Sequence, residues 1–265
     1  MALTMMSDLM PQDLVTVVVP SYNHEQYIER AISSIFRQTY HNFELVVIDD
    51  GSLDGSVAKL KKLQAQYNFL LITQENKGVC ETLNRAVREF SHGAYIAVLA
   101  SDDFWHQDKL KLQMKALHQH RDAHFCFSQA VEFKDENNPT KGRRFPRKCL
   151  SGRVLNKVFL RQHVPAGTMI FSRNLFDRLN GFDVTLKEED WDFVIRSAAI
   201  TEFCSVDEPL LFYRSHVANS MKTRARSKIF QEKMKILSKN MDLVGPWRWM
   251  VSVMVHFFHD VIYKK

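Results

Sequence analysis

Two pairs of adjacent aspartates follow short apolar runs, and such pairs can bind a metal ion or a nucleotide. Asp49 and Asp50 follow one run, and Asp102 and Asp103 follow another. Short β-branched runs of this kind are typical of buried parallel strands, and open α/β sheets bind ligands beyond the carboxyl ends of their strands. The spacing therefore predicts a cleft that receives four carboxylates, which a divalent cation, a ribose or a base edge could engage. The alternative for either pair is that the aspartate only caps the helix that follows.

A third acidic cluster lies later in the chain and could supply a general base. Glu188, Glu189, Asp190 and Asp192 crowd the start of a predicted helix. Neighbouring carboxylates disfavour one another's ionisation, which raises a pKa toward the range where a carboxylate can take a proton from a hydroxyl group. The structural alternative is that these acids only complement the positive end of the helix dipole.

The elements that would position these groups alternate between strand and helix up to about residue 133. The predicted strands span 15–19, 43–48, 69–73 and 95–99. The helices between them carry apolar residues at helical spacing, and the first is expected to begin with Asn23 as its N-cap and Gln26 three residues later. Such an alternation predicts a Rossmann-like, mostly parallel sheet with right-handed crossovers, in an α/β domain over residues 1–220.

Several classes of protein are disfavoured by what the sequence lacks. The turn after the first strand has neither the G-x-G-x-x-G pattern of dinucleotide-binding folds nor the P-loop pattern. A nucleotide diphosphate in this cleft would therefore need a divalent ion on the carboxylates to offset its charge. The four cysteines have no zinc or disulfide spacing, and no secretory signal is evident, so a cytoplasmic location is expected.

The positive charge is concentrated in residues 221–265, which hold ten Lys or Arg against three acidic residues, in a chain whose net charge is +6. The rest of the chain has no basic stripe, which argues against nucleic acid as a partner. A basic helix is predicted first, then an amphipathic helix after Pro246 that is too short to span a bilayer. We expect this tail to lie on an anionic membrane surface; the alternatives are packing on its own domain or on a second subunit of a homodimer.

Six segments between residues 15 and 220 resemble, in order and spacing, the family 2 glycosyltransferases of GT-A fold. They are Pro20-Ser21-Tyr22-Asn23, Ile48-Asp49-Asp50-Gly51-Ser52, Glu75-Asn76-Lys77-Gly78, Ala100-Ser101-Asp102-Asp103, Glu189-Asp190-Trp191-Asp192 and Tyr213-Arg214-Ser215-His216. The resemblance implies a GT-A domain followed by a C-terminal helical appendage.

For the donor, the resemblance implies a uracil-like pocket lined by Pro20, Tyr22 and Asp50, with Lys77 at its border. An aspartate is suited to accept the imide N–H of a uracil, so a UDP-sugar is the expected donor.

For the metal, the resemblance implies that Asp103 binds Mn²⁺ or Mg²⁺ and that Asp102 lies near the ribose or the donor sugar. His216 matches a late histidine that helps to close over the diphosphate or the metal. Position 100 is alanine where the fuller D-x-D-D form has aspartate, which removes one polar contact to the donor.

For the chemistry, the resemblance implies that Asp190 is the catalytic base, with Glu189 and Trp191 on the acceptor side. A single in-line displacement would invert the anomeric centre, while the cation stabilises the departing diphosphate. The expected acceptor is a saccharide, carried on a lipid at the membrane surface.

Two other functions are weighed against this one. A nucleotidyltransferase on a similar sheet would need basic residues near the first turn for a triphosphate, and residues 20–25 offer none. A non-catalytic protein that binds a nucleotide sugar or a partner would have lost acidic residues from its cleft. Asp102, Asp103, Glu189 and Asp190 are all present, which argues against this function.

Overall fold

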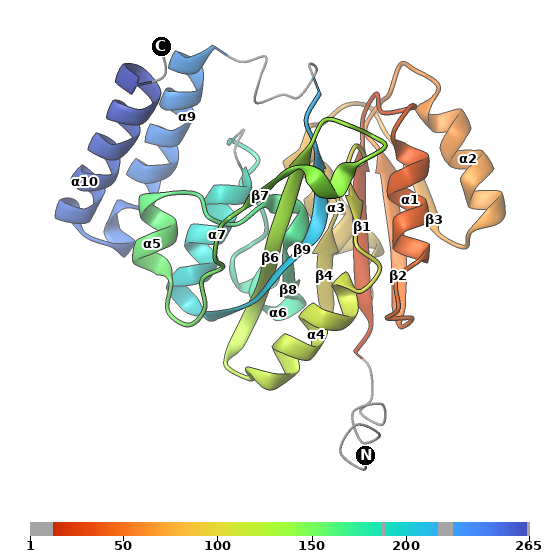
Figure 1. Ribbon diagram of the computed structural model, residues 1–265, viewed down its shortest axis with the longest axis horizontal. Coiled ribbons are helices and arrows are strands. Elements are labelled where there is room, and N and C mark those ends of the chain that lie inside the picture. The colour runs from red at the N-terminus through yellow and green to blue at the C-terminus, as the bar shows by residue number, and fades with distance from the viewer. Residues whose placement is uncertain (1–12, 187–188, 217–224, 264–265) are drawn as a thin grey trace.

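The first half of the chain forms four parallel strands linked by helices, as its periodicity predicts. The computed structural model describes residues 13–186, 189–216 and 225–263 (Figure 1). The strands are β1 (Val15–Ser21), β2 (Phe43–Asp49), β3 (Leu70–Thr73) and β4 (Tyr95–Val98), in the order β3-β2-β1-β4. The helices between them are α1 (Ile28–Phe36), α2 (Ser56–Gln66) and α3 (Val79–Phe90).

The second half extends this sheet with strands of both directions. Its strands are β5 (Phe104–Trp105), β6 (Ala123–Phe133), β7 (Arg143–Phe145), β8 (Ile170–Ser172) and β9 (Glu202–Arg214). Its helices are α4 (Lys109–Gln119), α5 (Leu155–Leu160), α6 (Arg173–Arg178) and α7 (Glu189–Ile200). Strand β8 pairs antiparallel with both β4 and β6, and β9 pairs parallel with β6. The α/β class is confirmed; β1 to β4 form one set of parallel neighbours, and β6 and β9 form a second parallel pair.

Apolar side chains cover both faces of the sheet, because successive residues of a strand point to opposite sides. Val17 and Val19 of β1 belong to a core with α1, α2 and α4 on one face. Val18 belongs to a second core with α3, α6 and α7 on the other face. Both faces of the sheet are therefore covered by helices.

The start of α1 differs from the prediction. Tyr27 is the N-cap of this helix, and no side chain caps it. Asn23 has a φ of 54°, and its side-chain oxygen accepts a hydrogen bond from the backbone N–H of Leu53, 2.8 Å away. The prediction that Asn23 caps the helix was wrong because its side chain instead binds the loop after β2.

The C-terminal segment forms a helical hairpin that packs on α5 and α7 (Figure 1). Helix α9 (Arg226–Lys239) is followed by a 3₁₀ turn (Met241–Leu243), by α10 (Pro246–Phe257) and by a π-helical turn (Phe258–Tyr263). Ile236 and Leu237 of α9 are fully buried against Trp191 and Ile195 of α7. Packing on the chain's own domain, one of the alternatives for the tail, is thus observed for one face of the hairpin. The predicted boundary at residue 220 lies outside the described residues.

None of the described helices is long and apolar enough to span a membrane.

Candidate active site

Asp49, at the end of β2, has a structural role within the sheet. Its carboxylate accepts hydrogen bonds from the backbone N–H and the hydroxyl of Ser52, at 2.9 and 2.7 Å. A longer bond of 3.2 Å comes from the hydroxyl of Ser21 in the neighbouring strand. Asp49 therefore fixes the loop after β2 against β1, and its side chain is buried away from the cleft.

Asp50 holds the turn that follows β3. One carboxylate oxygen accepts hydrogen bonds from the amide of Gln74 (2.7 Å) and the backbone N–H of Lys77 (2.9 Å), and the other accepts one from the N–H of Gly78 (2.8 Å). An ionised carboxylate has about four acceptor positions. The described residues therefore leave one acceptor position of Asp50 for a ligand, beside the turn that Asp50 fixes.

The other residues predicted to contact the nucleoside lie at the solvent-facing rim of this edge. Pro20 is partly exposed at the end of β1, Tyr22 exposes 44% of its surface, and Lys77 is exposed in the turn beside Asp50. An exposed tyrosine at a strand end provides a ring on which a base can stack.

Three of the described residues could hold a metal ion at this edge. Nε2 of His216 lies 3.0 Å from Oδ2 of Asp102, and Nε2 of His24 lies 4.0 Å from the same oxygen. The three ligand atoms lie within 4.8 Å of one another, and all three residues are partly buried. Imidazole and carboxylate groups are ligands for first-row divalent metals.

The fold brings these three residues together from distant parts of the chain. His24 follows β1, Asp102 follows β4 and His216 follows β9. Strands β4 and β6 are both antiparallel to β8, and β9 is parallel to β6, so β9 runs in the direction of β1 and β4. All three strands therefore end at the same edge.

His24 is a site residue that the sequence analysis missed. Its Nδ1 atom lies 2.7 Å from the hydroxyl of Ser101, which orients the ring and leaves Nε2 facing Asp102. Burial lowers the pKa of His24, although the charge of Asp102 acts to raise it. The lowered pKa favours the neutral imidazole that a metal requires. The sequence could have indicated His24 as a site residue, because it directly follows the Pro20–Asn23 segment.

Asp103 points into the protein instead. It is 3% exposed, and its Oδ1 accepts a hydrogen bond of 2.7 Å from the backbone N–H of Arg214 in β9. Burial, reinforced by the charge of Asp102, raises the pKa of Asp103 well above its usual range. This geometry favours Asp102 over Asp103 as the metal ligand, contrary to the order implied by the resemblance.

Asp190 lies in the first turn of α7. This helix directly precedes β9, so its first turn lies toward the edge at which β9 ends. Oδ2 of Asp190 accepts a hydrogen bond of 2.9 Å from the side-chain amide of Gln162. Burial raises the pKa of Asp190, although the bond from Gln162 opposes this shift. A carboxylate with a raised pKa is suited to general-base catalysis.

The side chain of Glu189 lies outside the described part of the chain.

Trp191 does not lie where the acceptor was expected. It is 2% exposed, and its Nε1 donates a hydrogen bond of 2.7 Å to the backbone oxygen of Val158. Its ring centroid lies 5.1 Å from that of His256 in α10. Successive residues of a helix point about 100° apart, so Trp191 enters the core between α7 and the C-terminal hairpin. The structure thus corrects its assignment to the acceptor side.

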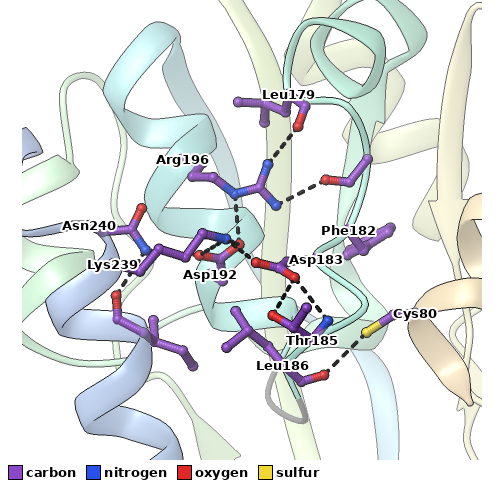
Figure 2. Close-up of polar contacts among 12 residues, drawn as sticks. Cys80, Leu179, Phe182, Asp183, Thr185, Leu186, Asp192, Arg196, Lys239 and Asn240 are labelled. Atoms are coloured by element: carbon purple, nitrogen blue, oxygen red, sulfur yellow. Dashed lines mark hydrogen bonds and ion pairs between the residues drawn. The ribbon is translucent and has the colours of Figure 1, made fainter.

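A buried polar network joins the C-terminal hairpin to α7, as Figure 2 shows. The carboxylate of Asp192 is fully buried and accepts hydrogen bonds from Arg196 (2.7 Å), Lys239 (3.0 Å) and Asn240 (2.8 Å). Lys239 also binds Asp183, in the segment before α7. The last turn of α9 is therefore fixed to the helix that carries Asp190.

The sequence profile of Glycosyl transferase family 2 matches residues 16–179. Among curated proteins, the chain is similar to the UDP-Glc:alpha-D-GlcNAc-diphosphoundecaprenol beta-1,3-glucosyltransferase WfgD of Escherichia coli. The two are 38% identical over 104 residues, which cover 39% of this chain and 41% of that protein. The match thus spans about two fifths of the relative's length.

Solved structures share the fold at low sequence identity. The chain matches TarS 1-349 of S. aureus in complex with UDP-GlcNAc with a TM-score of 0.73 and 17% identity, over 92% of this chain and 72% of that chain. It also matches the mannosyltransferase PcManGT of Pyrobaculum calidifontis, in complex with GDP-Man and Mn²⁺, with a TM-score of 0.68 and 20% identity, over 94% of this chain and 71% of that chain. These likenesses confirm the fold class.

Proposed function

The chain belongs to glycosyl transferase family 2, and from this premise we propose that it moves a sugar from a UDP-sugar to a hydroxyl group of a saccharide with inversion. One observation carries the proposal: His24, Asp102 and His216 converge at the edge where β1, β4 and β9 end. A UDP-linked donor is supported by the name of the E. coli relative and by the nucleotide in the TarS complex.

The three converging residues fit Mn²⁺ better than Mg²⁺, because Mg²⁺ prefers oxygen ligands and two of the three are imidazoles. The carboxylate of Asp102 supplies charge, and both imidazoles present a nitrogen to it from partly buried positions. A divalent cation held there would act as a Lewis acid on the diphosphate. Tyr22 and Pro20 would contact the base, the free acceptor position of Asp50 would take its N–H, and Lys77 would border it.

Asp190 takes the proton in the proposed reaction. The acceptor hydroxyl attacks the anomeric carbon as its proton passes to the Asp190 carboxylate, and the bond from that carbon to the diphosphate oxygen breaks. This single displacement gives a β-linkage from an α-linked donor. The side-chain amide of Gln162 keeps the carboxylate oriented while it accepts the proton.

The acceptor is proposed to be a saccharide on a lipid diphosphate, at the inner face of the cytoplasmic membrane. The name of the E. coli relative describes such an acceptor for that protein. On this chain, α10 exposes Trp247, Met250, Met254 and Phe257 on the face that does not pack on α5. Together with the basic residues of 221–265, this face is suited to an anionic membrane surface.

A donor panel tests the reaction. UDP-glucose, UDP-N-acetylglucosamine and GDP-mannose are compared for Mn²⁺-dependent hydrolysis and for transfer to a lipid-linked saccharide. Hydrolysis of one UDP-sugar that EDTA abolishes is the expected result. Full activity in EDTA would contradict the metal assignment, whereas donor binding without turnover would favour a non-catalytic binding protein. Release of diphosphate from a nucleoside triphosphate would favour a nucleotidyltransferase.

Co-sedimentation with vesicles tests the tail. The full chain should bind anionic vesicles at low salt and only partly dissociate at high salt, because salt screens the charges but not the apolar contact. A chain that ignores vesicles and forms a dimer in light scattering would show that the exposed face of α10 is a subunit interface.

A further inference from the structure

A second concave surface lies away from the nucleotide cleft, between α10 and the end of α5. It has a volume of about 420 Å³. Its apolar lining comes from α10 and the turn after it, and its polar lining from Arg161 and His259. The apolar residues are Val251, Met254, Val255 and Phe258. We call this surface the α10 groove.

The α10 groove exposes apolar surface that the rest of the described chain does not cover. Met254 is 51% exposed and Phe258 is 44% exposed. Each square ångström of apolar surface removed from water contributes about 25 cal/mol, so an apolar occupant would be stabilised here. Large contiguous apolar patches are uncommon on soluble monomers and often mark binding surfaces.

The end of the groove at α5 is positively charged. Arg161 is exposed, and its guanidinium forms no hydrogen bond or ion pair with any described residue. Lys157, one turn earlier in α5, is exposed as well. Both cations act on His163, whose pKa is lowered by burial first and by these two charges next. An unpaired arginine beside an apolar groove complements an amphiphile with a phosphate group, which it can bind through two parallel hydrogen bonds.

The charged end of the groove is one residue along the chain from a contact of the candidate catalytic base. Arg161 is followed by Gln162, whose side-chain amide donates to Oδ2 of Asp190 at 2.9 Å. A phosphate bound by Arg161 would therefore lie one residue from the group that contacts the base.

We infer that the α10 groove binds the lipid diphosphate of the acceptor. The isoprenoid chain lies along Val251, Met254 and Phe258, Arg161 binds the diphosphate, and the attached sugar extends toward Asp190. The identity of the ligand rests on the proposed function, whereas the amphiphile site rests on the groove and its charge.

Titration calorimetry with farnesyl diphosphate, kept below its micelle concentration and in EDTA, tests the site on the full chain. Farnesol lacks the charge and inorganic diphosphate lacks the chain, so each should bind at least about tenfold more weakly, since one charge-assisted contact is worth about that factor. Arg161→Gln and Met254→Asp should each weaken farnesyl diphosphate binding by about tenfold. Trp247→Ser is the matched control, because Trp247 is exposed on the same helix but does not line the groove.

Equal binding of farnesol and farnesyl diphosphate, or indifference to Arg161→Gln, would overturn the inference. Binding to anionic vesicles without binding of monomeric farnesyl diphosphate would also overturn it, and would assign the surface to the membrane. This assay contains no nucleotide sugar, so its outcome is independent of whether the chain transfers sugar. In turnover, Met254→Asp should raise KM for a lipid-linked acceptor.

Discussion

The ammonium group of Lys239, in the last turn of α9, lies 3.0 Å from the buried carboxylate of Asp192 in α7 (Figure 2). Asp192 is two residues from Asp190, so this ion pair connects the C-terminal hairpin to the turn that carries the candidate base. Removing Lys239 leaves Arg196 as the one cation that pairs with this buried carboxylate among the described residues, and weakening a buried ion pair is destabilising. The hairpin is therefore expected to influence both stability and catalysis.

Lys239→Met should lower the free energy of unfolding by about 1–3 kcal/mol, less than for a fully buried pair because Lys239 is partly exposed. Urea titration measures this loss. Turnover should fall while the KM for the donor stays constant. Lys239→Arg keeps the charge and should retain much of the wild-type turnover. The matched control is Lys235→Met, which removes the ion pair of the exposed Lys235 with Glu232 on the same helix. Equal effects of Lys239→Met and Lys235→Met would contradict the prediction.

Asp102→Asn should abolish Mn²⁺ binding with little loss of stability, because the Asp102 carboxylate faces His24 and His216. Asp103→Asn should keep both Mn²⁺ binding and stability, because the amide oxygen of Asn can still accept the hydrogen bond from the backbone N–H of Arg214. Electron paramagnetic resonance measures free Mn²⁺, and thermal unfolding monitors the fold. Loss of Mn²⁺ binding in Asp103→Asn alone would return the metal to the position implied by the family resemblance.

Asp190→Asn should reduce turnover by roughly 10²–10⁴, the usual contribution of a general base, and leave UDP affinity unchanged. Calorimetry with UDP and steady-state rates separate these effects. A parallel loss of UDP affinity would place Asp190 in the donor site.

Gln162→Leu should shift the acid limb of the rate profile to higher pH. The hydrogen bond from Gln162 stabilises the ionised form of Asp190, so its loss raises a pKa that burial already raises. The base then becomes protonated at a higher pH, and activity is lost earlier on acidification. A rate profile from pH 4 to 8 measures the shift, and an unchanged acid limb would show that this limb reports another group.

The parallel half of the fold could be predicted because its signals are local. Strands β1 and β2 are seven residues each, and α1 and α3 carry apolar residues at a regular spacing. The second half has long strands in β6 and β9, but the pairing of its strands has no such local signal. Strand β5 has two residues and β8 has three, too few to show a period, and their pairing is set by distant partners.

The site could be predicted only to the level of segments. The acids at the ends of β2 and β4 were found because they interrupt apolar runs. Which member of each adjacent pair faces the cleft depends on contacts with other strands, such as the bond from Arg214 to Asp103. Trp191 was misplaced for the same reason, because the hairpin that buries it lies far along the chain.

Lys109 at the start of α4 is a buried cation that serves neither the cleft nor the α10 groove. It is fully buried, and its Nζ has no hydrogen-bond partner among the described residues. Nζ lies 4.1 Å from the ring centroid of Trp105. Burial lowers the pKa of Lys109 to about 7, although the Cys126 thiol acts in the opposite direction. Holding an ammonium group there therefore costs stability.

Lys109→Met should stabilise the protein by about 2–4 kcal/mol at pH 6, and by less at pH 9. Between a folded pKa of about 7 and the ordinary value of 10.5, the unfolded chain binds a proton that the folded chain does not, so wild-type stability rises with pH in this window. Urea titrations at both pH values measure the difference. Lys111→Met, at an exposed position of α4, is the control. A destabilised Lys109→Met variant would show instead that the contact with Trp105 outweighs the cost of burying the ammonium group.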